Sequence, residues 1–571
     1  MFKEILERIC RKYTFYPRKY QLHFAEVLDE FIVNEVNKPI FVRLPCGYGK
    51  TLIGLLPFTG QNLAGEYPLS SRLIYVLPTR ALINFFAKTA KQLMERIGLQ
   101  GVDIAIEHGE THTSPHYFKD VIITTLDTFF YVYTKKAVID NHLEFPAGCI
   151  ATSTVVFDEA HMYQGGEGLT FIALKKLIQH LTEARIPVII MTATMPEKLE
   201  KYLLEGTGKM SVEYGLSGLD EKYESNEGKK EYDVRLGDEL GITDDVDIAN
   251  IVKNYKRALM VFNTVSKAQK TYRELKDKFD NVILLHSRLC RVVREKYESR
   301  IHDLISRGEH VIIVSTQVCE SGLDFNAEIL ITEAAPSDAL TQRVGRCARR
   351  GGYGEVIIVK PKSSHPYEEQ YVSIAMQYLK NLSGKTRGIV FSSFIENMKF
   401  INLMDYTPRE ENRMARELRT FMDGWLKVAE APPENLDLRI RETNFISILH
   451  LVDNKLYNEI VDALKYRGKI SLAKLNTSIE DFRTILKEHT FTLDMNILFE
   501  HKDGERTVKS FLLHEINGGK FVIRISNEMD ENGRNNYFLT KINPDQKIIP
   551  YNMYLINNRY CNDEVGLHDL Q

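Results

Sequence analysis

The stretch PIFVRLPCGYGKTLIGLL, residues 39–56, decides the fold of the first part of the chain. A short apolar run comes first, a loop with Gly47 and Gly49 follows, and a helix-like apolar stretch begins after Thr51. Glycines in such a loop let backbone N–H groups converge on phosphate oxygens, while Lys50 neutralises the phosphates and the Thr51 hydroxyl ligates Mg²⁺. Leu44 stands where the general pattern has its first glycine. We predict a nucleotide-phosphate loop made of Pro45, Cys46, Gly47, Tyr48, Gly49, Lys50 and Thr51.

The strand, loop and helix pattern of this stretch recurs along the chain. Up to about residue 195, strand-like runs such as RLIYVLP, DVIITT and PVIIMTAT alternate with longer amphipathic stretches. A second series, RALMVFNT, NVILLHS, HVIIVST, AEILITEA and EVIIVK, begins after about residue 235. Strands that alternate with helices form parallel sheets covered on both faces. The sequence therefore predicts an α/β fold with two tandem parallel-sheet domains.

Shifts in composition indicate the domain boundaries. Residues 206–232 are rich in Gly, Ser and charge, as a linker is, and the pattern becomes helical beyond about residue 366. From about residue 490, turn signals such as Asp503-Gly504 and Asn532-Gly533 separate short strand-like runs. We predict a nucleotide-binding domain at 1–215, a linker at 216–234, a second α/β domain at 235–365, a helical accessory region at 366–489 and a small, mostly β domain at 490–571.

Composition excludes several classes of protein. The 571 residues are 44% hydrophobic and 26% charged, as in soluble globular proteins, and their formal net charge of -3 restricts any nucleic-acid site to a local channel. The seven cysteines have no paired short spacing, which favours reduced thiols over a zinc or disulfide framework. No secretory signal and no apolar run of the roughly 18 residues that a membrane span needs is present. We expect a cytoplasmic protein with no membrane partner.

A second apolar run, residues 154–157, ends in the adjacent carboxylates Asp158 and Glu159, which Ala160 and His161 follow. Hydrolysis of a nucleotide needs one carboxylate beside the metal and one that polarises the attacking water. We predict that Asp158 is a metal ligand together with Thr51, and that Glu159 acts on the water. A strand-end acidic pair alone is often a helix cap, but here it follows a phosphate loop by about a hundred residues.

The third motif is QRVGRCAR, residues 342–349, in the second α/β domain. Arg346 and Arg349 are three residues apart, so on a helix they share a face and both reach charge that develops on a phosphate. Gln342, which opens the motif, is assigned to the same catalytic set. A phosphate loop in one domain and paired arginines in the next imply a nucleotide held in a cleft between them, which hydrolysis opens and closes.

Together these motifs resemble the superfamily 2 helicases that have a DEAH box and two RecA-like domains. With the three motifs above, the matching segments span residues 16–350 in the family's order. The resemblance implies an ATP hydrolase that uses ATP and Mg²⁺ and moves along nucleic acid. The further segments are YPRKYQ with Gln21, Pro78-Thr79-Arg80, Thr124-Thr125 with Asp127-Thr128, Thr192-Ala193-Thr194, Phe262-Asn263-Thr264, Ser315-Thr316-Gln317 and Gly322-Leu323-Asp324.

The resemblance also implies roles for individual residues. Gln21 is expected to read adenine, and Gly322 and Asp324 are expected to face the nucleotide from the second domain. Thr192 and Thr194 are expected to couple hydrolysis to domain movement. Small polar residues at strand ends are expected to hold the phosphates of one strand without reading its sequence. These are Thr79, Arg80, Thr124, Thr125, Thr128, Asn263, Thr264 and Thr316.

A narrower resemblance lies in residues 315–351 and in RYCNDEVGL at 559–567. Both are similar to the CRISPR-associated helicase of type I systems, which a crRNA-guided surveillance complex recruits to unwind and degrade target DNA. Many members carry a His-Asp (HD) nuclease domain before the helicase, for which the 49 residues before Lys50 leave no room. The resemblance therefore implies a stand-alone 3′ to 5′ translocase and helicase on single-stranded DNA, active in antiviral interference with a separate HD nuclease subunit.

Two alternatives stay open. The motifs grip a phosphate backbone and do not exclude RNA, so an RNA helicase of the same superfamily is the first. The second is a nucleotide-gated scaffold subunit that changes conformation without unwinding. Against the second, the complete set of expected catalytic residues is present, whereas a pure switch could lose Glu159 or an arginine.

Overall fold

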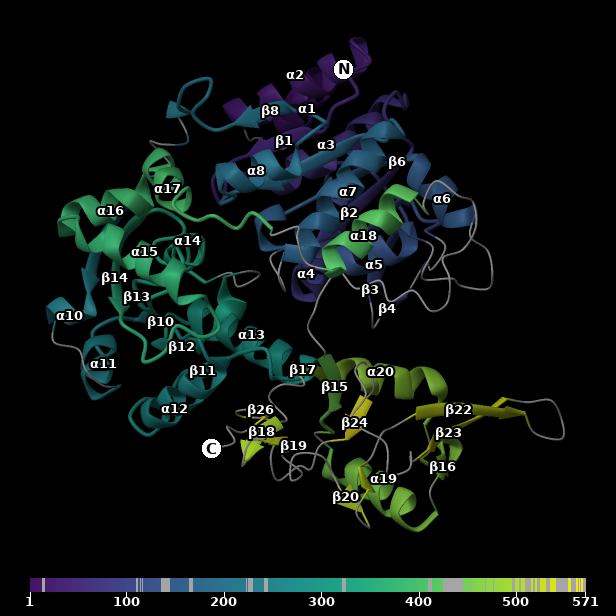
Figure 1. Cartoon of the computed structure of the whole chain (residues 1–571), viewed down its shortest axis with the longest axis vertical. Helices are drawn as coiled ribbons and strands as arrows, with labels where there is room; N and C mark the ends of the chain where they lie inside the picture. Colours follow the sequence, from purple (N-terminus) through teal and green to yellow (C-terminus); the bar gives the residue numbers. More distant parts are fainter. Residues whose placement is uncertain are drawn as a thin grey trace.

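The computed structural model describes most of the first 424 residues and short pieces of the remainder. The described residues are 1–12, 16–108, 111–112, 114, 117–134, 144–163, 168–221, 223, 229–240, 245–320, 325–408, 413–424, 445–451, 453–467, 469–475, 477–494, 499–502, 505–508, 515–516, 519–520, 524–529, 535–540, 553–555, 561–562, 564 and 566–567. Figure 1 shows two α/β domains and, beyond them, a group of smaller elements toward the C-terminus. Every described helix falls short of the length and apolarity that crossing a membrane requires.

The first domain is built on an eight-stranded sheet in the order β4-β3-β5-β2-β6-β7-β1-β8, in which only the β3–β4 pair is antiparallel. The five central strands β5, β2, β6, β7 and β1 match predicted runs, because parallel strands covered on both faces need near-continuous apolar sequence, whereas β4 and β3 at one edge and β8 at the other were not predicted. The strands are β1 (Ile40–Arg43), β2 (Arg72–Leu77), β3 (Ile104–His108), β4 (Thr111–His112), β5 (Val121–Thr125), β6 (Ser153–Phe157), β7 (Val188–Thr192) and β8 (Met210–Glu213).

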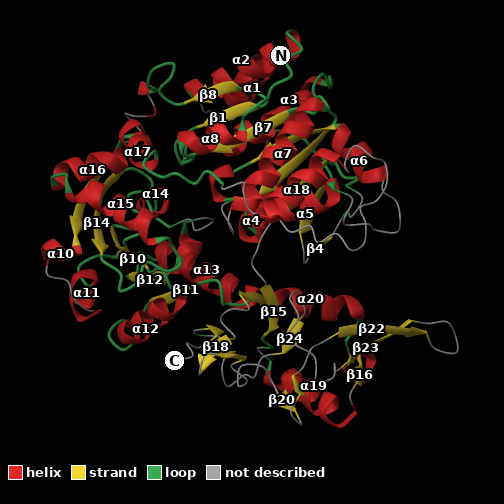
Figure 2. Ribbon diagram, in the orientation of Figure 1, coloured by secondary structure: helices red, strands yellow, loops and turns green. Residues whose placement is uncertain are grey.

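Helices cover both faces of this sheet (Figure 2). The sheet separates the apolar core of the domain into two clusters, one under the helices of each face. On β2, Leu73 and Tyr75 pack with the cluster under α1 to α4, whereas Ile74 and Val76 pack with the cluster under α5 and α7. This alternation follows from the two-residue period of a strand. The helices are α1 (Phe2–Lys12), α2 (Lys19–Val33), α3 (Lys50–Ala64), α4 (Arg80–Arg96), α5 (Leu126–Tyr133), α6 (Glu144–Ala151), α7 (Leu169–Glu183) and α8 (Glu197–Leu203), with the 3-10 turn η1 (Ala160–Met162).

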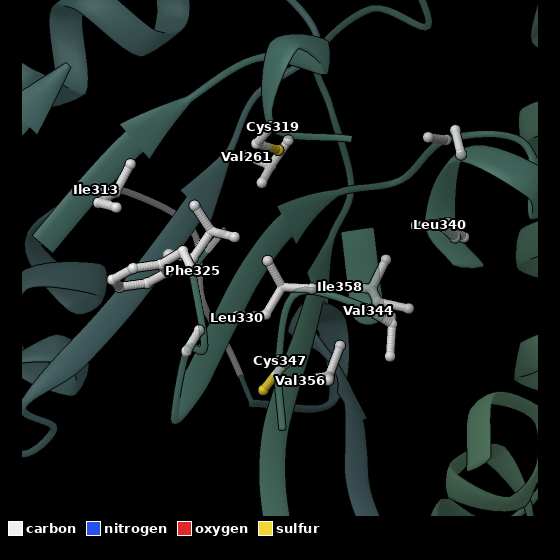
Figure 3. Close-up of a cluster of buried hydrophobic side chains, with 14 of the residues drawn as sticks. Val261, Ile313, Cys319, Phe325, Leu330, Leu340, Val344, Cys347, Val356 and Ile358 are labelled. Carbon is white, nitrogen blue, oxygen red and sulfur yellow. The ribbon is translucent and has the colours of Figure 1, made fainter. Parts of the chain in front are cut away.

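The second domain has a six-stranded parallel sheet in the order β11-β12-β10-β13-β14-β9. Val261, Ile313, Leu330 and Val356 from its central strands form one apolar core with α14 and its neighbours (Figure 3). The strands are β9 (Lys230–Leu236), β10 (Arg257–Val261), β11 (Val282–Leu285), β12 (Val311–Ser315), β13 (Ile329–Glu333) and β14 (Gly352–Val359). The helices are α10 (Gly237–Leu240), α11 (Asp245–Val252), α12 (Val265–Lys276), α13 (Arg291–Ser306), α14 (Ser337–Val344), α15 (Glu369–Lys380), α16 (Gly384–Ser392) and α17 (Phe394–Ile401), with the 3-10 turn η3 (Gln317–Cys319).

The sheet of the second domain begins inside the segment that the sequence suggested as a linker. β9 starts at Lys230 and pairs in parallel with β14, with Tyr232, Val234 and Leu236 on its buried side. The earlier part of the segment is not a free connection either, because the Asp220 carboxylate accepts hydrogen bonds from the Tyr48 hydroxyl (2.5 Å) and the Lys19 backbone N–H (3.0 Å). The sequence did not predict these contacts, because the many charged residues and glycines of the segment are typical of a linker.

One helix from the expected accessory region belongs to the core of the first domain. α18 (Arg413–Gly424) packs along α7, with Leu418, Phe421 and Met422 buried in the cluster of the first domain, as the green helix among blue elements in Figure 1 shows. Asp423 forms an ion pair with Lys176 at 2.8 Å. The chain thus leaves the first domain, forms the second, and returns.

The described parts beyond α18 are short. β15 and β17 pair antiparallel and β24 joins β15 in parallel, so strands begin before residue 490, where the sequence suggested them. Ile448 and Phe491 from β15 and β17 pack in the core of the second domain. The elements are β15 (Phe445–Leu449), α19 (Asn454–Arg467), β16 (Lys469–Ser471), η5 (Leu472–Leu475), α20 (Ile479–His489), β17 (Thr490–Asp494), β18 (Phe499–Lys502), β19 (Glu505–Val508), β20 (Glu515–Ile516), β21 (Gly519–Lys520), β22 (Arg524–Met529), β23 (Asn535–Thr540), β24 (Met553–Leu555), β25 (Cys561–Asn562) and β26 (Gly566–Leu567).

Candidate active site

The predicted phosphate loop lies between β1 and α3. Gly47 and Gly49 have φ angles of 86° and 85°, in the left-handed region that favours glycine. A Cβ atom at Gly49 would lie 2.6 Å from the Gln21 amide nitrogen, so a side chain there would displace the amide of Gln21. Gln21 is itself buried, and its Oε1 accepts a hydrogen bond from the Arg18 backbone N–H at 3.0 Å. The predicted adenine-reading residue therefore adjoins the loop.

Lys50, Asp158 and Glu159 come together at the carboxyl ends of β1 and β6. The Lys50 ammonium lies 4.0 Å from a Glu159 carboxylate oxygen. Asp158 accepts hydrogen bonds from the Tyr75 hydroxyl at 2.7 Å and from the Glu159 backbone N–H at 2.8 Å. Glu159 has a φ of 47°, a conformation that costs energy for a residue with a side chain and recurs at functional sites. Its Oε2 is buried and has no hydrogen-bond partner among the described residues.

The electrostatics of this cluster suit a bound cation. Burial and the neighbouring charge of Glu159 raise the pKa of Asp158 to about 7. Burial opposes ionisation of Glu159 too, but the positive charge of Lys50, together with that of Arg346, outweighs it and lowers its pKa. A buried carboxyl group that ionises only reluctantly is stabilised as an anion by a divalent cation. Asp158 and the Thr51 hydroxyl line the same cleft and supply the oxygen ligands that Mg²⁺ prefers.

Residues of both domains line this cleft, which has a volume of about 590 Å³. Arg346 and Arg349 contribute from the second domain. The expectation that a helix carries both arginines is wrong, because α14 ends at Val344 with Gly345 as its C-cap. Beyond it, Cys347 forms a β-bridge with Ala327, and this turn brings both arginines to the cleft.

Gln342 connects the two domains directly. Its Nε2 lies 2.6 Å from Nε2 of His161 and 3.4 Å from Oγ1 of Thr194. The other ring nitrogen of His161, Nδ1, lies 3.0 Å from Oγ1 of Thr192. Burial lowers the pKa of His161, and a neutral ring with its proton on Nδ1 satisfies both contacts. The DEAH box, the Thr192–Thr194 segment and the QRVGRCAR motif are therefore joined by hydrogen bonds.

Arg343 holds the second-domain motifs to one another. Its side chain is fully buried, and its Nε donates to the Glu320 carboxylate at 2.8 Å. Its Nη1 also donates to Oδ1 of Asn263 at 3.1 Å. Further acceptors of its N–H groups are the Thr332 hydroxyl, the Glu333 carbonyl and the Tyr367 hydroxyl. The carbonyl oxygen of Glu320 accepts from Arg346, so this buried network extends to the cleft.

The residues expected to hold a nucleic-acid strand lie at the carboxyl ends of β2, β5, β10 and β12. Thr79, Thr125 and Thr264 cap the helices α4, α5 and α12, each accepting a hydrogen bond from a backbone N–H at 3.3 Å. Helix N-termini carry partial positive charge and favour phosphate. The side chains of Thr124, Thr125, Asn263 and Thr316 are buried, whereas those of Thr79, Arg80, Thr128 and Thr264 are half-buried.

The structure adds residues to the site that sequence reasoning missed. Arg18 donates to the Gly47 carbonyl at 2.6 Å, and Tyr223 donates to the Cys46 carbonyl at 3.3 Å. Lys230 also lines the cleft. Arg18 adjoins Gln21 in YPRKYQ and could have been found there, but Tyr223 and Lys230 lie in the segment suggested as a linker. Gly322 and Asp324 lie outside the described residues.

Family models match both α/β domains. Residues 25–202 match the DEAD/DEAH box helicases, and residues 254–352 match the C-terminal part of the CRISPR-associated nuclease/helicase Cas3. The first match covers residues of the first α/β domain, and the second match covers residues of the second α/β domain.

Relatives and solved structures agree with these matches. The chain is similar to the CRISPR-associated helicase Cas3 of Thermoproteus tenax, with 27% identity over 73% of each chain. It is 26% identical to the putative CRISPR-associated nuclease/helicase Cas3 of Methanocaldococcus jannaschii, over 73% of this chain and 60% of that protein. The fold resembles T. fusca Cas3 with AMPPNP, with a TM-score of 0.60 and 17% identity over 84% of this chain and 64% of the other. The chain thus spans less than two thirds of two of these three proteins.

Proposed function

Because the chain has the core of an ATP-hydrolysing DEAD/DEAH box helicase with a Cas3-like second domain, we propose that it is an ATP-dependent translocase and helicase on single-stranded DNA. It moves 3′ to 5′ and unwinds target DNA in type I CRISPR interference, in the cytoplasm. Its partners are a crRNA-guided surveillance complex and a separate HD nuclease subunit. The observation that carries the proposal is that one cleft is lined by Lys50 and Glu159 from one domain and by Arg346 and Arg349 from the other.

The chemistry follows from the residues that line the cleft. Lys50 binds the terminal phosphates of the nucleotide, and Glu159, whose Oε2 has no hydrogen-bond partner among the described residues, accepts a proton from the attacking water. Arg346 and Arg349 stabilise the negative charge that develops on the transferred phosphoryl group. Thr51 and Asp158 would hold Mg²⁺, which neutralises charge on the phosphates when it is bound.

Movement along a strand follows from the contact between the domains. The contacts of Gln342 with His161 and Thr194 link the domains across the cleft, and release of phosphate removes the charge that Arg346 and Arg349 bind. The helix N-termini capped by Thr79 and Thr264 belong to different domains. Phosphates held at both places are therefore drawn together and released in each cycle, without any reading of sequence.

Support for a separate nuclease comes from the relatives. The T. tenax protein is named a helicase and the chain covers 73% of it, whereas the M. jannaschii protein is named a nuclease/helicase and the chain covers 60% of it. The check is a divalent-metal nuclease assay on single-stranded DNA. DNA that is cut by the purified chain in the presence of a divalent metal, without ATP and not when a chelator is added, would overturn the assignment to a separate subunit.

The decisive measurement is steady-state ATP hydrolysis with no nucleic acid, with single-stranded DNA and with RNA of the same sequence. The Lys50→Ala variant is the blank, because it removes the cation at the phosphates. Stimulation by DNA and not by RNA is the expected result, followed by displacement of a strand only from duplexes with a 3′ single-stranded tail. Equal stimulation by RNA would replace the proposal with an RNA helicase. Absence of hydrolysis, also with the surveillance complex added, would leave a nucleotide-gated scaffold.

A further inference from the structure

Lys230 occupies an unusual place at the start of β9. Along this strand Tyr232, Val234 and Leu236 are buried and Glu231 is exposed, so the alternation puts Lys230 on the inward side. The next inward residue, Tyr232, donates a hydrogen bond to the Cys347 carbonyl at 3.1 Å and so packs against the arginine-rich motif. A charged side chain takes an inward position only where something compensates for its lost hydration.

None of the described carboxylates compensates for the inward position of Lys230. It lines the nucleotide cleft with Cys46, Gly47 and Arg346. Burial and the positive charge of Arg346 lower its pKa. Within the described part of the chain no carboxylate forms an ion pair with Lys230, whereas the adjacent Lys229 is 73% exposed and lies 3.9 Å from a Glu231 carboxylate oxygen. An anion bound in the cleft between Lys230 and Arg346 would offset both the lost hydration of the lysine and the repulsion between the two cations.

We propose that the Lys230 ammonium binds the terminal phosphate of the nucleotide triphosphate. The inference rests on the proposed function insofar as a nucleotide occupies this cleft. Cys46 and Gly47 belong to the phosphate loop, and Arg346 comes from the motif that faces developing charge, so the lysine lies on the phosphate side of the site. Lys230 is also the first residue of the second domain's sheet, so its bond to the phosphate draws that domain onto the first.

The test compares three variants. Lys230→Met removes the charge and keeps the length of the side chain, Lys230→Arg restores a cation, and Lys229→Met is the matched control on the exposed side. The readouts are the affinities for ADP and for a non-hydrolysable ATP analogue by equilibrium titration, the KM for ATP, and the melting temperature. A charge-assisted hydrogen bond to phosphate predicts that Lys230→Met lowers the affinity for the analogue roughly tenfold or more and raises the KM for ATP by a similar factor. We expect less than a twofold change for ADP, recovery in Lys230→Arg to within about threefold of the wild type, and no change in Lys229→Met.

Several results would overturn the inference. Wild-type affinity for the analogue in Lys230→Met excludes the contact. An equal loss of affinity for ADP and for the analogue would show that Lys230 does not contact the terminal phosphate. A lowered melting temperature with no recovery in Lys230→Arg makes the residue structural. Because the titration needs no hydrolysis, it stands when the wild type binds the analogue without hydrolysing ATP, an outcome that counts against the proposed function alone.

Discussion

Replacing Arg343 with Met tests whether the buried network organises the second domain. The Arg343 side chain is fully buried and its Nε donates to the Glu320 carboxylate at 2.8 Å. The variant leaves that carboxylate buried without its cation, which costs about 3–5 kcal/mol of folding free energy. The double variant Arg343→Met/Glu320→Gln removes the charge as well, so most of this loss is expected to be recovered.

The folding free energy that Arg343→Met loses also depends on pH. Burial already raises the pKa of Glu320, and Arg343 is the main charge that opposes the rise. Without Arg343 the folded-state pKa of this carboxyl rises further above its unfolded value. A raised carboxyl pKa gives stability that is present at low pH and is lost as pH rises through the folded pKa. The stability of Arg343→Met is therefore expected to be closer to that of the wild type at pH 5 than at pH 8.

The assay is urea unfolding followed by circular dichroism at both pH values, with hydrogen exchange of residues 337–344 reporting on α14. A cost below about 1 kcal/mol at pH 8, less than an ordinary hydrogen bond contributes, would refute the reasoning. The reasoning would also be refuted if Arg343→Met lost the same unfolding free energy at both pH values, or if the double variant were no more stable than the single one.

Three further predictions concern turnover, coupling and packing. Glu159→Gln should lower ATP hydrolysis by about 10²–10⁴-fold and leave nucleotide affinity intact, and unchanged turnover would contradict the role of that carboxylate. Gln342→Ala removes the contacts to His161 and Thr194, at about 1 kcal/mol for each hydrogen bond, so DNA-stimulated hydrolysis should fall roughly fivefold to thirtyfold with nucleotide binding retained. Full stimulation in that variant would show that the bridge is dispensable. Phe421→Ala on α18 should destabilise the first domain by about 3–5 kcal/mol in urea unfolding, against at most about 1 kcal/mol for the exposed control Asp423→Asn. Equal effects would mean that α18 does not belong to that core.

Local sequence was sufficient for most of the two α/β domains. Runs such as RLIYVLP and HVIIVST are strands because parallel strands buried on both faces need apolar residues at every position. The cleft-lining residues Lys50, Thr51, Asp158 and Glu159 were found for a similar reason, since phosphate loops and strand-end carboxylates follow fixed local patterns. Their individual roles and the division into domains stay predictions.

Tertiary contacts decided what local sequence could not. Nothing in the pattern of α18 says that Phe421 packs on the first domain, because an amphipathic helix does not encode its partner. Gly345 ends α14 at Val344, so the arginines of QRVGRCAR lie in a turn although their spacing suits a helix. Lys230 lies in a charged segment that the sequence suggested as a linker. Its pairing with Gly352 on β14 shows that it belongs to a strand, and the alternation of that strand gives it an inward position.

The return of α18 to the first domain constrains the order in which the chain can fold. Its residues complete a core whose other members end near residue 204, so a ribosome must synthesise the whole second domain before that core can close. At usual synthesis rates, the roughly 200 residues in between take on the order of 10–40 s. During that interval the face of α7 that later receives Leu418, Phe421 and Met422 stays uncovered. For the same reason, a fragment cut at residue 215 would lack part of its own core, and the smallest autonomous form of the first domain is a discontinuous one.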